Sequence, residues 1–169
     1  LPSAASIPES AWVLSATAFS EPLAASTHSV EFVQGIPVAL DGEALSPVAL
    51  IEKLEQLAGR YGIGRGIHLG DTILGTKGRV AFEAPAAITL ITAHRELEKL
   101  VLSAQQMRVK DSISATYGDL VHEGKQLDLA CDDIEAMLKS SQRRVTGTVT
   151  FCLRPGHLFI EGIESPHSL

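Results

Sequence analysis

The amino-acid sequence predicts one domain of the α+β class, with helices and antiparallel strands mixed along the chain. Short segments in which apolar residues alternate with polar ones, as on half-buried strands, lie toward both ends of the chain. Between them, longer segments carry apolar residues every three to four positions, which indicates helices with one buried face. The 169 residues, 45% of them hydrophobic, suffice for one core but hardly for two domains.

Residues 1–29 are rich in Ala, Ser and Pro, which predicts an irregular leading segment before a domain formed by residues 30–169. A natural domain seldom begins with such a segment. The chain also stops at Leu169 directly after a strand-like stretch, without a closing helix. Both ends therefore look cut, as expected of a piece of a larger protein.

The domain is expected to begin with an antiparallel ribbon. Residues 29–33 alternate polar and apolar side chains, and residues 36–40 are extended and apolar. The dipeptide Gln34-Gly35 between them suits a tight connection, which brings the two segments side by side.

A helix is predicted to start at Ser46 and Pro47. The serine oxygen can accept a hydrogen bond from a free N–H of the first turn, and proline lacks only an N–H that this turn leaves unused. Gly59 is placed to end the helix in the left-handed conformation. The buried stripe of this helix comprises Leu50, Ile51, Leu54, Leu57 and Ala58.

The glycine-rich residues 62–85 predict a loop that leads into a strand at residues 80–82. After Pro85 the pattern changes to a helical period, which predicts the longest helix of the chain. The apolar stripe of this second helix comprises Ala86, Leu90, Ala93, Leu97 and Val101.

On this second helix His94 flanks the stripe, and Glu98 or Lys99 is expected to face water. The continuation through residues 107–121 is less regular, and Gly118 and Gly124 are expected to break it.

A further helix is predicted from about Asp128 or Cys131 to Gln142, where apolar residues share one face. The chain is expected to end in a hairpin formed by residues 145–153 and 158–163, with residues 154–157 as its turn.

Composition excludes several classes of function. Acidic residues outnumber basic ones, 20 to 14, and a net charge of −6 gives no general attraction to nucleic acid or anionic membranes. No stretch approaches the roughly 20 apolar residues that cross a bilayer, and the start of the chain lacks a signal-peptide pattern. Cys131 and Cys152 lack CxxC spacing, so we expect two buried, reduced thiols in a soluble cytoplasmic protein.

Two glycine-rich segments approach nucleotide-binding motifs and fail. Ile67 stands where a dinucleotide-binding loop has its third glycine, and Thr76 intrudes before the lysine of residues 70–77, which otherwise approach a phosphate-binding loop. The six histidines include no pair at the spacing of metal ligands. His94 and Glu98, four apart on one helical face, suit an acid-base pair, although a boundary contact is the commoner role and no hydrolase nucleophile motif accompanies them.

Four segments in register resemble the argininosuccinate synthase family, and the resemblance runs from about Val30 to Leu169. Each segment is weak alone, but their shared order and spacing argue against coincidence. They are residues 35–42 (GIPVALDG), residues 61–65 (YGIGR) with 75–79 (GTKGR), residues 83–85 (EAP) leading into 93–98 (AHRELE), and residues 145–149 (VTGTV), with Ser165-Pro166 near the end.

This resemblance implies a part in arginine biosynthesis. Enzymes of the family join citrulline to aspartate with ATP and magnesium: the ureido oxygen attacks the α-phosphate, pyrophosphate leaves, and the aspartate amine displaces AMP. The resemblance also implies that the chain is the carboxy-terminal synthetase domain, that the ATP-binding domain is absent from it, and that it is inactive alone. In a whole homotetrameric enzyme it would supply one wall of the citrulline pocket and most subunit contacts.

The family grips the polar end of citrulline with a Glu and, twelve residues later, a Tyr, and these positions hold Gly70 and Phe82 here. Without the carboxylate, the ammonium of free citrulline lacks a paired acceptor, which costs several kcal/mol. Either Asp71 supplies the charge through a shifted backbone, or the α-amine of the substrate is acylated and Gly70 makes room for the acyl group. The predicted substrate-binding residues are Gly70, Asp71, Thr72, Phe82, Lys77 and Arg79, with no catalytic residue and no metal ligand.

Cationic residues in the same segment allow two roles. Lys77 and Arg79 either orient carboxylates or phosphates at the domain boundary or form structural ion pairs, whereas Arg65 is expected to be structural. Because Gly70 and Phe82 lack the carboxylate and the hydroxyl, the alternative function is a non-catalytic assembly or ligand-binding module of the same fold.

Overall fold

The computed structural model describes residues 5–71 and 74–169 and confirms the α+β class. The strands are β1 (Ser26–Val33), β2 (Ile36–Leu40), β3 (Glu43–Ala44), β4 (Arg65–Asp71), β5 (Lys77–Glu83), β6 (Gly147–Arg154) and β7 (His157–Glu164). The helices are α1 (Pro47–Arg60), α2 (Pro85–Val101), α3 (Ala104–His122) and α4 (Leu129–Gln142).

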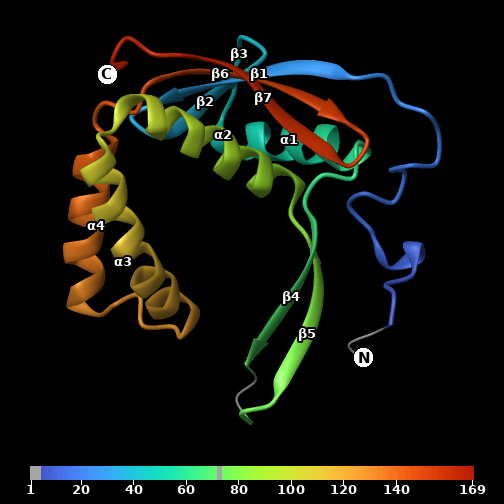
Figure 1. Cartoon of the computed structure of the whole chain (residues 1–169), viewed down its shortest axis with the longest axis horizontal. Helices are drawn as coiled ribbons and strands as arrows, with labels where there is room; N and C mark the ends of the chain where they lie inside the picture. Colours follow the sequence, from blue (N-terminus) through green and yellow to red (C-terminus); the bar gives the residue numbers. More distant parts are fainter. Residues whose placement is uncertain (1–4, 72–73) are drawn as a thin grey trace.

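Within the described residues, the strands form a five-stranded antiparallel sheet, ordered β3-β2-β1-β6-β7, and a separate ribbon of β4 and β5. Helices α1 and α2 cover one face of the large sheet (Figure 1). The β4–β5 ribbon and the α3–α4 pair extend from this two-layer body as two arms. The fold therefore has a compact body and two projections of different secondary structure.

The first ribbon is confirmed, because β1 and β2 pair antiparallel. Gln34 and Gly35 have φ angles of 51° and 81°, and positive φ at both turn residues suits the twist of two adjacent strands. The N–H of Gly35 donates to the carbonyl of Val145 at 2.7 Å, which ties this turn to the chain just before β6. Strand β1 begins at Ser26, within residues 1–29.

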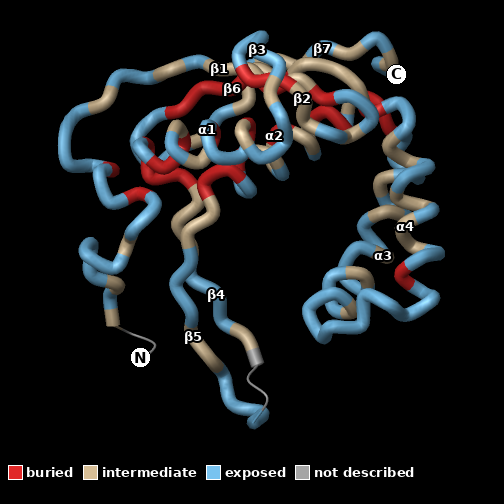
Figure 2. Tube along the Cα trace, turned by 180° about the vertical axis from the view of Figure 1, so that it is seen from behind, coloured by how far each residue is buried: buried red, intermediate tan, exposed pale blue. Residues whose placement is uncertain are grey.

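The core lies between the large sheet and the helices α1 and α2. Figure 2 shows that burial is concentrated in this body and that both arms are largely exposed. Burying each large aliphatic side chain contributes about 1.5–3 kcal/mol, so the hydrophobic stabilisation of the molecule resides in the body. Fully buried members include Val30, Phe32, Leu50, Leu54, Ala93, Leu97, Val149, Phe151 and Leu153.

Helix α1 begins as predicted, since the Ser46 side chain accepts a hydrogen bond from the first turn at 3.3 Å. The prediction that Gly59 ends it is wrong: the helix continues to Arg60, and Gly62 adopts the positive φ of 71°. Gly59 is required by packing instead, because a Cβ there would lie 2.6 Å from the carbonyl oxygen of Leu14. The leading segment thus passes directly over α1.

Predictions for the middle of the chain need three corrections. The loop predicted from residue 62 is wrong, because residues 65–71 form strand β4. The prediction that α2 is the longest helix is also wrong, since α3 has 19 described residues and α2 has 17. Gly118 lies inside α3 and does not break it, since a lone helical glycine costs only about 1 kcal/mol.

The end of the chain folds as predicted. Helix α4 starts after Asp128, whose side chain accepts from the N–H of Ala130 at 2.9 Å. The β6–β7 hairpin then closes with Arg154 opposite His157. Among the described helices, none combines the length and apolarity needed to cross a membrane.

Candidate functional site

Five of the six predicted site residues, all but Thr72, lie on the β4–β5 ribbon, which joins α1 to α2. Gly64, with φ 86°, begins this arm where a Cβ would lie 2.5 Å from backbone atoms of Ala84 and Pro85. The N–H of Ala84 donates to the Gly64 carbonyl at 3.0 Å. This close backbone contact fixes the base of the ribbon against the start of α2.

Strand pairing sorts the ribbon residues into two faces, because successive side chains of a strand point to opposite sides. We call them the glycine face and the arginine face. The glycine face comprises Gly66, His68, Gly70, Gly78, Val80 and Phe82. The arginine face comprises Arg65, Ile67, Leu69, Lys77, Arg79, Ala81 and Glu83.

The structure divides the predicted substrate-binding residues between these faces. Gly70 and Phe82 belong to the glycine face, whereas Lys77 and Arg79 belong to the arginine face. A ligand lying on one face of the ribbon therefore does not contact all four.

Two predicted residues are not placed by their side chains. The backbone of Asp71 pairs with Lys77 at the end of the ribbon. The side chain of Asp71 and the whole of Thr72 lie outside the described residues. The hypothesis that Asp71 replaces the charge missing at Gly70 therefore stays a prediction.

The leading segment contacts the arginine face at three residues, Arg65, Arg79 and Glu83. Arg79 donates to the carbonyl of Ala5 at 2.6 Å, and Arg65 donates to the hydroxyl and the carbonyl of Ser15 at 2.6 and 2.8 Å. Arg65 also forms an ion pair with Glu9 at 2.7 Å. Figure 1 shows the leading segment beside the ribbon, on the side away from α3 and α4. The two arginines thus hold chain segments together.

Aromatic rings of the leading segment flank Arg65. Its guanidinium carbon lies 5.0 Å from the ring centroid of Trp12 and 5.2 Å from that of Phe19. Such cation–π contacts contribute about 0.5–1 kcal/mol each at partly exposed sites. The contacts of Arg65 agree with the structural role expected for it.

Glu83 anchors the leading segment from the arginine face. Its carboxylate accepts the backbone N–H groups of Val13, Leu14 and Ser15 at 2.5, 3.0 and 2.9 Å, and the Ser15 hydroxyl at 2.5 Å. Burial alone would raise the pKa of Glu83, but the hydrogen bonds from the Ser15 side chain and from these three N–H groups hold that pKa below its ordinary value. The carboxylate therefore stays ionised at neutral pH.

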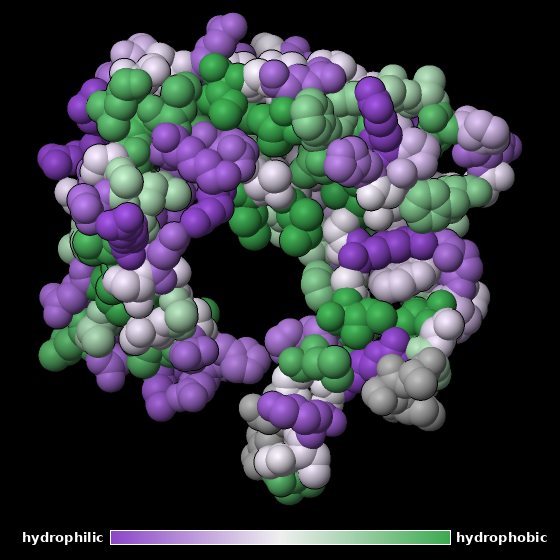
Figure 3. Space-filling view, in the orientation of Figure 1, coloured by the Kyte–Doolittle hydropathy of each residue, from purple (hydrophilic) through white to green (hydrophobic). Residues whose placement is uncertain are grey.

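The glycine face is open, and two of its rings lie over glycine backbone. A Cβ at Gly66 would lie 2.5 Å from the Phe82 ring, and a Cβ at Gly70 would lie 2.5 Å from Nε2 of His68. Only glycine leaves room for the rings in these positions. The side chains of Phe82 and Val80 remain 41% and 59% exposed. Figure 3 shows open space between the ribbon and the α3–α4 pair.

His68 is the residue of this face that the sequence analysis leaves out. The signal for it is the period of a strand, because His68 lies two positions before Gly70 and therefore on the same face. A loop over these residues carries no such period. The unrecognised strand β4 is thus the reason for the omission.

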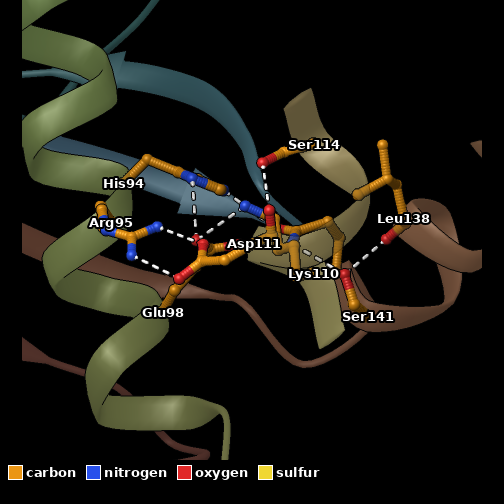
Figure 4. A network of polar contacts seen from close by, with 9 residues as sticks. His94, Arg95, Glu98, Lys110, Asp111, Ser114, Leu138 and Ser141 are labelled. Carbon is orange, nitrogen blue, oxygen red and sulfur yellow. Dashed lines mark hydrogen bonds and ion pairs between the residues drawn. The ribbon is translucent and has the colours of Figure 1, made fainter. Parts of the chain in front are cut away.

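A second polar cluster lies where α2, α3 and α4 meet (Figure 4). Glu98 is 1% exposed and Lys99 is exposed, so Lys99 is the residue of this predicted alternative that faces water. Its carboxylate accepts from Lys110 of α3 at 3.0 Å and from the side-chain amide of Gln142 of α4 at 2.7 Å. The Nε2 atom of His94 lies 2.9 Å from Oε1 of Gln142.

His94 and Glu98 are not arranged as a catalytic pair. Nδ1 of His94 lies 3.9 Å from the Glu98 carboxylate, beyond hydrogen-bond distance. Burial lowers the pKa of His94 and Lys110 lowers it further, while Glu98 and Gln142 oppose the shift only in part. The nearby Ser141 hydroxyl donates to the carbonyl of Leu138 rather than to His94, so it is not an activated nucleophile.

Two adjoining cavities of about 460 and 330 Å³ border this second cluster. In the described part of the chain, every buried side-chain nitrogen and oxygen has a hydrogen-bond partner. The cluster therefore offers an entering ligand no unsatisfied buried group, and its charges serve to join three helices.

Neither a metal site nor a phosphate-binding loop is formed by the described residues. No group of three or more His, Cys, Asp or Glu side chains among them is placed to hold a metal ion. Residues 70 and 71 pair antiparallel with residues 78 and 77, whereas a phosphate-binding loop joins a strand to a helix. Residues 72 and 73 of the sequence motif lie outside the described residues. Both cysteines are free and buried.

Comparisons with known proteins identify the family. A family model described as the arginosuccinate synthase C-terminal domain matches residues 3–169. Proteins named argininosuccinate synthase from Xanthomonas campestris pv. campestris, Dehalococcoides mccartyi and Methanocaldococcus jannaschii are 46%, 46% and 41% identical over 162, 140 and 140 residues.

These matches cover 96%, 83% and 83% of this chain, but only 38%, 34% and 35% of the three relatives. The chain thus spans little more than a third of the length of the curated relatives it matches. The family model covers nearly every residue, the leading segment included. The chain therefore belongs to the argininosuccinate synthase family and corresponds to its carboxy-terminal domain.

Proposed function

We propose that this domain forms one wall of the substrate pocket of a ligase that condenses citrulline, or an N-acyl citrulline, with aspartate in an ATP-dependent reaction. The observation that supports the proposal is the glycine face of the ribbon. It combines an exposed phenyl ring, an imidazole and a bare backbone floor, whereas Arg65, Arg79 and Glu83 of the opposite face are already engaged by the leading segment. Apolar surface with a few convergent polar groups is typical of small-molecule sites.

ATP and magnesium are proposed to bind mainly to the part of the relatives' length that this chain does not match. The described residues do not fit a nucleotide, because residues 70 and 71 pair with strand β5 rather than lead into a helix, and no carboxylate cluster among them suits a metal ion. The contribution of this domain is to bind and orient the amino-acid substrate next to that activating part.

Within the proposed pocket, the ring of Phe82 would pack on the aliphatic chain of the substrate. Lys77 and Arg79 belong to the opposite face, and Arg79 already donates to Ala5. We therefore assign Arg79 to holding the leading segment, and Lys77 to the boundary with the activating part.

The whole protein is further proposed to act in the cytoplasm as a homotetramer. In α3 no residue is buried, and in α4 only Cys131 is, within the described part of the chain. A helix pair with so little buried surface suits contact with a neighbouring subunit. Light scattering of the purified protein measures the assembly directly.

The alternative is a non-catalytic assembly or ligand-binding module. Gly70 and Phe82 favour it, because they lack a carboxylate and a hydroxyl with which to grip an amino acid. Such a module would form oligomers but would show no affinity for citrulline or its derivatives.

The test uses protein expressed from the complete reading frame that encodes these residues. Its intact mass first establishes whether an activating part is present. Pyrophosphate release is then measured with ATP, aspartate, and either citrulline or N-acetylcitrulline. No release with either substrate would remove the proposed function and favour the non-catalytic module.

A matched pair of variants locates the pocket. Val80 and Ala81 are adjacent, exposed residues that belong to opposite faces of the ribbon. Val80→Trp obstructs the glycine face and is expected to raise the KM for the citrulline substrate about tenfold or more, whereas Ala81→Trp changes it less than about threefold. Equal effects of the two variants would contradict a pocket on the glycine face.

A further inference from the structure

The imidazole of His68 is placed differently from those of His28 and His94. The ring of His28 contacts Ser26 and Asp41, and that of His94 contacts Gln142. Among the described residues, His68 has no hydrogen-bond partner, and its side chain is exposed on the glycine face. An imidazole whose ring nitrogens are both available is a ready donor or acceptor for a ligand.

The backbone holds this ring beside the predicted substrate position. A Cβ at Gly70 would lie 2.5 Å from Nε2 and 3.1 Å from Cδ2 of His68. The ring therefore lies along β4 over Gly70, and any side chain at that position would displace it. The imidazole of His68 occupies the space over Gly70, so a substrate group that approaches Gly70 contacts this ring.

Charge decides which substrate group fits there. The described members of the glycine face are three glycines, His68, Val80 and Phe82, and none of these residues has a carboxylate. An ammonium brought against it would lose its hydration without an opposite charge, which is strongly unfavourable. A carbonyl or carboxylate oxygen would instead receive the N–H of the imidazole, as a charge-assisted bond when the ring is protonated.

We propose that His68 is the specificity-determining residue of this pocket and that it selects a substrate whose α-nitrogen carries an acyl group. This inference rests on the proposed function. The acyl carbonyl accepts a hydrogen bond from the imidazole of His68. Gly70 is required because it admits the imidazole.

The inference is tested on protein from the complete reading frame by measuring kcat/KM for N-acetylcitrulline and for citrulline. The unmodified protein is expected to prefer N-acetylcitrulline. His68→Ala is expected to lower kcat/KM for N-acetylcitrulline about tenfold, the effect of losing one hydrogen bond, and to leave the value for citrulline within about twofold. The KM values for ATP and aspartate should not change.

Two more variants separate hydrogen bonding from shape. His68→Gln keeps an N–H donor and should restore part of the preference that His68→Ala removes. Gly70→Glu displaces the imidazole and adds a carboxylate, so it should reverse the preference in favour of citrulline. The matched control is His122→Ala, which removes an exposed histidine from α3 and should leave both substrates unaffected. Thermal unfolding of each variant confirms that the fold is retained.

The outcomes distinguish this inference from the function on which it rests. Ligase activity with a preference for free citrulline, or an equal loss for both substrates in His68→Ala, would overturn the role of His68 and leave the proposed function standing. The complete absence of pyrophosphate release with either substrate would overturn both. A pH profile of kcat/KM for N-acetylcitrulline that is identical in the unmodified protein and His68→Gln would also count against the imidazole.

Discussion

Two glutamates in neighbouring elements, Glu83 of β5 and Glu98 of α2, each collect several hydrogen bonds but from different kinds of donor. Glu83 receives three backbone N–H groups and a hydroxyl from the leading segment. Glu98 receives side chains from α3 and α4, and is 1% exposed. Glu83 therefore holds the leading segment against the β4–β5 ribbon. Glu98 instead holds the α3–α4 pair against α2 of the body.

This difference separates polar groups that already have hydrogen-bond partners within the domain from a polar group that is available to a ligand. At both glutamates the described donors and acceptors satisfy one another, so each cluster is complete without a ligand. On the glycine face of the ribbon, in contrast, the imidazole of His68 contacts no described polar group. We therefore expect substitutions at the two glutamates to change stability, and substitutions on the glycine face to change substrate binding.

The largest effect is expected for Glu98→Ala. Removal of the carboxylate leaves the ammonium of Lys110 and the amide of Gln142 without their shared partner in a site largely closed to water. The free energy of unfolding should fall by about 3 kcal/mol, as measured by urea denaturation. The matched control, Glu96→Ala, removes a carboxylate of the same helix that pairs with Lys99 at the surface, and should cost less than about 0.5 kcal/mol. Equal losses of unfolding free energy in the two variants would contradict the role of Glu98 in holding α3 and α4 to α2.

A smaller and more local effect is expected for Glu83→Ala. The N–H groups of residues 13–15 would turn to water, so the free energy of unfolding should fall by only about 1 kcal/mol. Hydrogen exchange of these amides should accelerate at least about tenfold, while the amides of β1 and β6 keep their protection. Unchanged hydrogen exchange at residues 13–15 in Glu83→Ala would contradict the role of Glu83 in holding the leading segment.

In the unmodified protein, acid should weaken the same contact between Glu83 and the leading segment. The pKa of Glu83 is lower in the folded state than in the unfolded chain, so its contribution to stability is complete above the unfolded value. That contribution is lost as the pH falls below about 4 and through the lowered value. Hydrogen exchange of the leading segment should therefore rise in that range, and Glu83→Gln should abolish the dependence.

The parts of the fold that the sequence predicts correctly are those determined by local chemistry. A two-residue turn at Gln34-Gly35 and a cap at Ser46 depend on neighbouring residues alone, so the sequence places both. Strand β4 depends on its pairing with β5, where Gly66 lies under the ring of Phe82 of the neighbouring strand rather than in a flexible loop. Glycine content there conceals the strand and, with it, the division of the site into two faces.

The burial of Glu98 is invisible in the sequence for a related reason. Its partners lie 12 and 44 positions away, in two other helices, and no helical period distinguishes a charge that is solvated from one that is paired at a distance. The contacts of the leading segment with Arg65 and Glu83 span 50 to 70 positions and escape a local pattern in the same way. Family resemblance locates the ribbon as a candidate site, but only the pairing of β4 with β5 adds His68.

The smallest effect concerns the titration of His94 in the polar cluster around Glu98. Burial lowers the pKa of His94 in the folded state, so on acidification the unfolded chain takes up the proton first. The stability contribution of neutral His94 is complete above about pH 6.5 and declines as the pH falls toward the lowered folded value. The free energy of unfolding should therefore drop by on the order of 1 kcal/mol between pH 7 and 5.5, and this slope should flatten in His94→Gln. The control His122→Gln removes an exposed imidazole of α3 and should keep the slope, because that ring is not enclosed between helices. If the free energy of unfolding has the same pH dependence in His94→Gln and in the unmodified protein, the polar cluster around Glu98 does not depend on the protonation of His94.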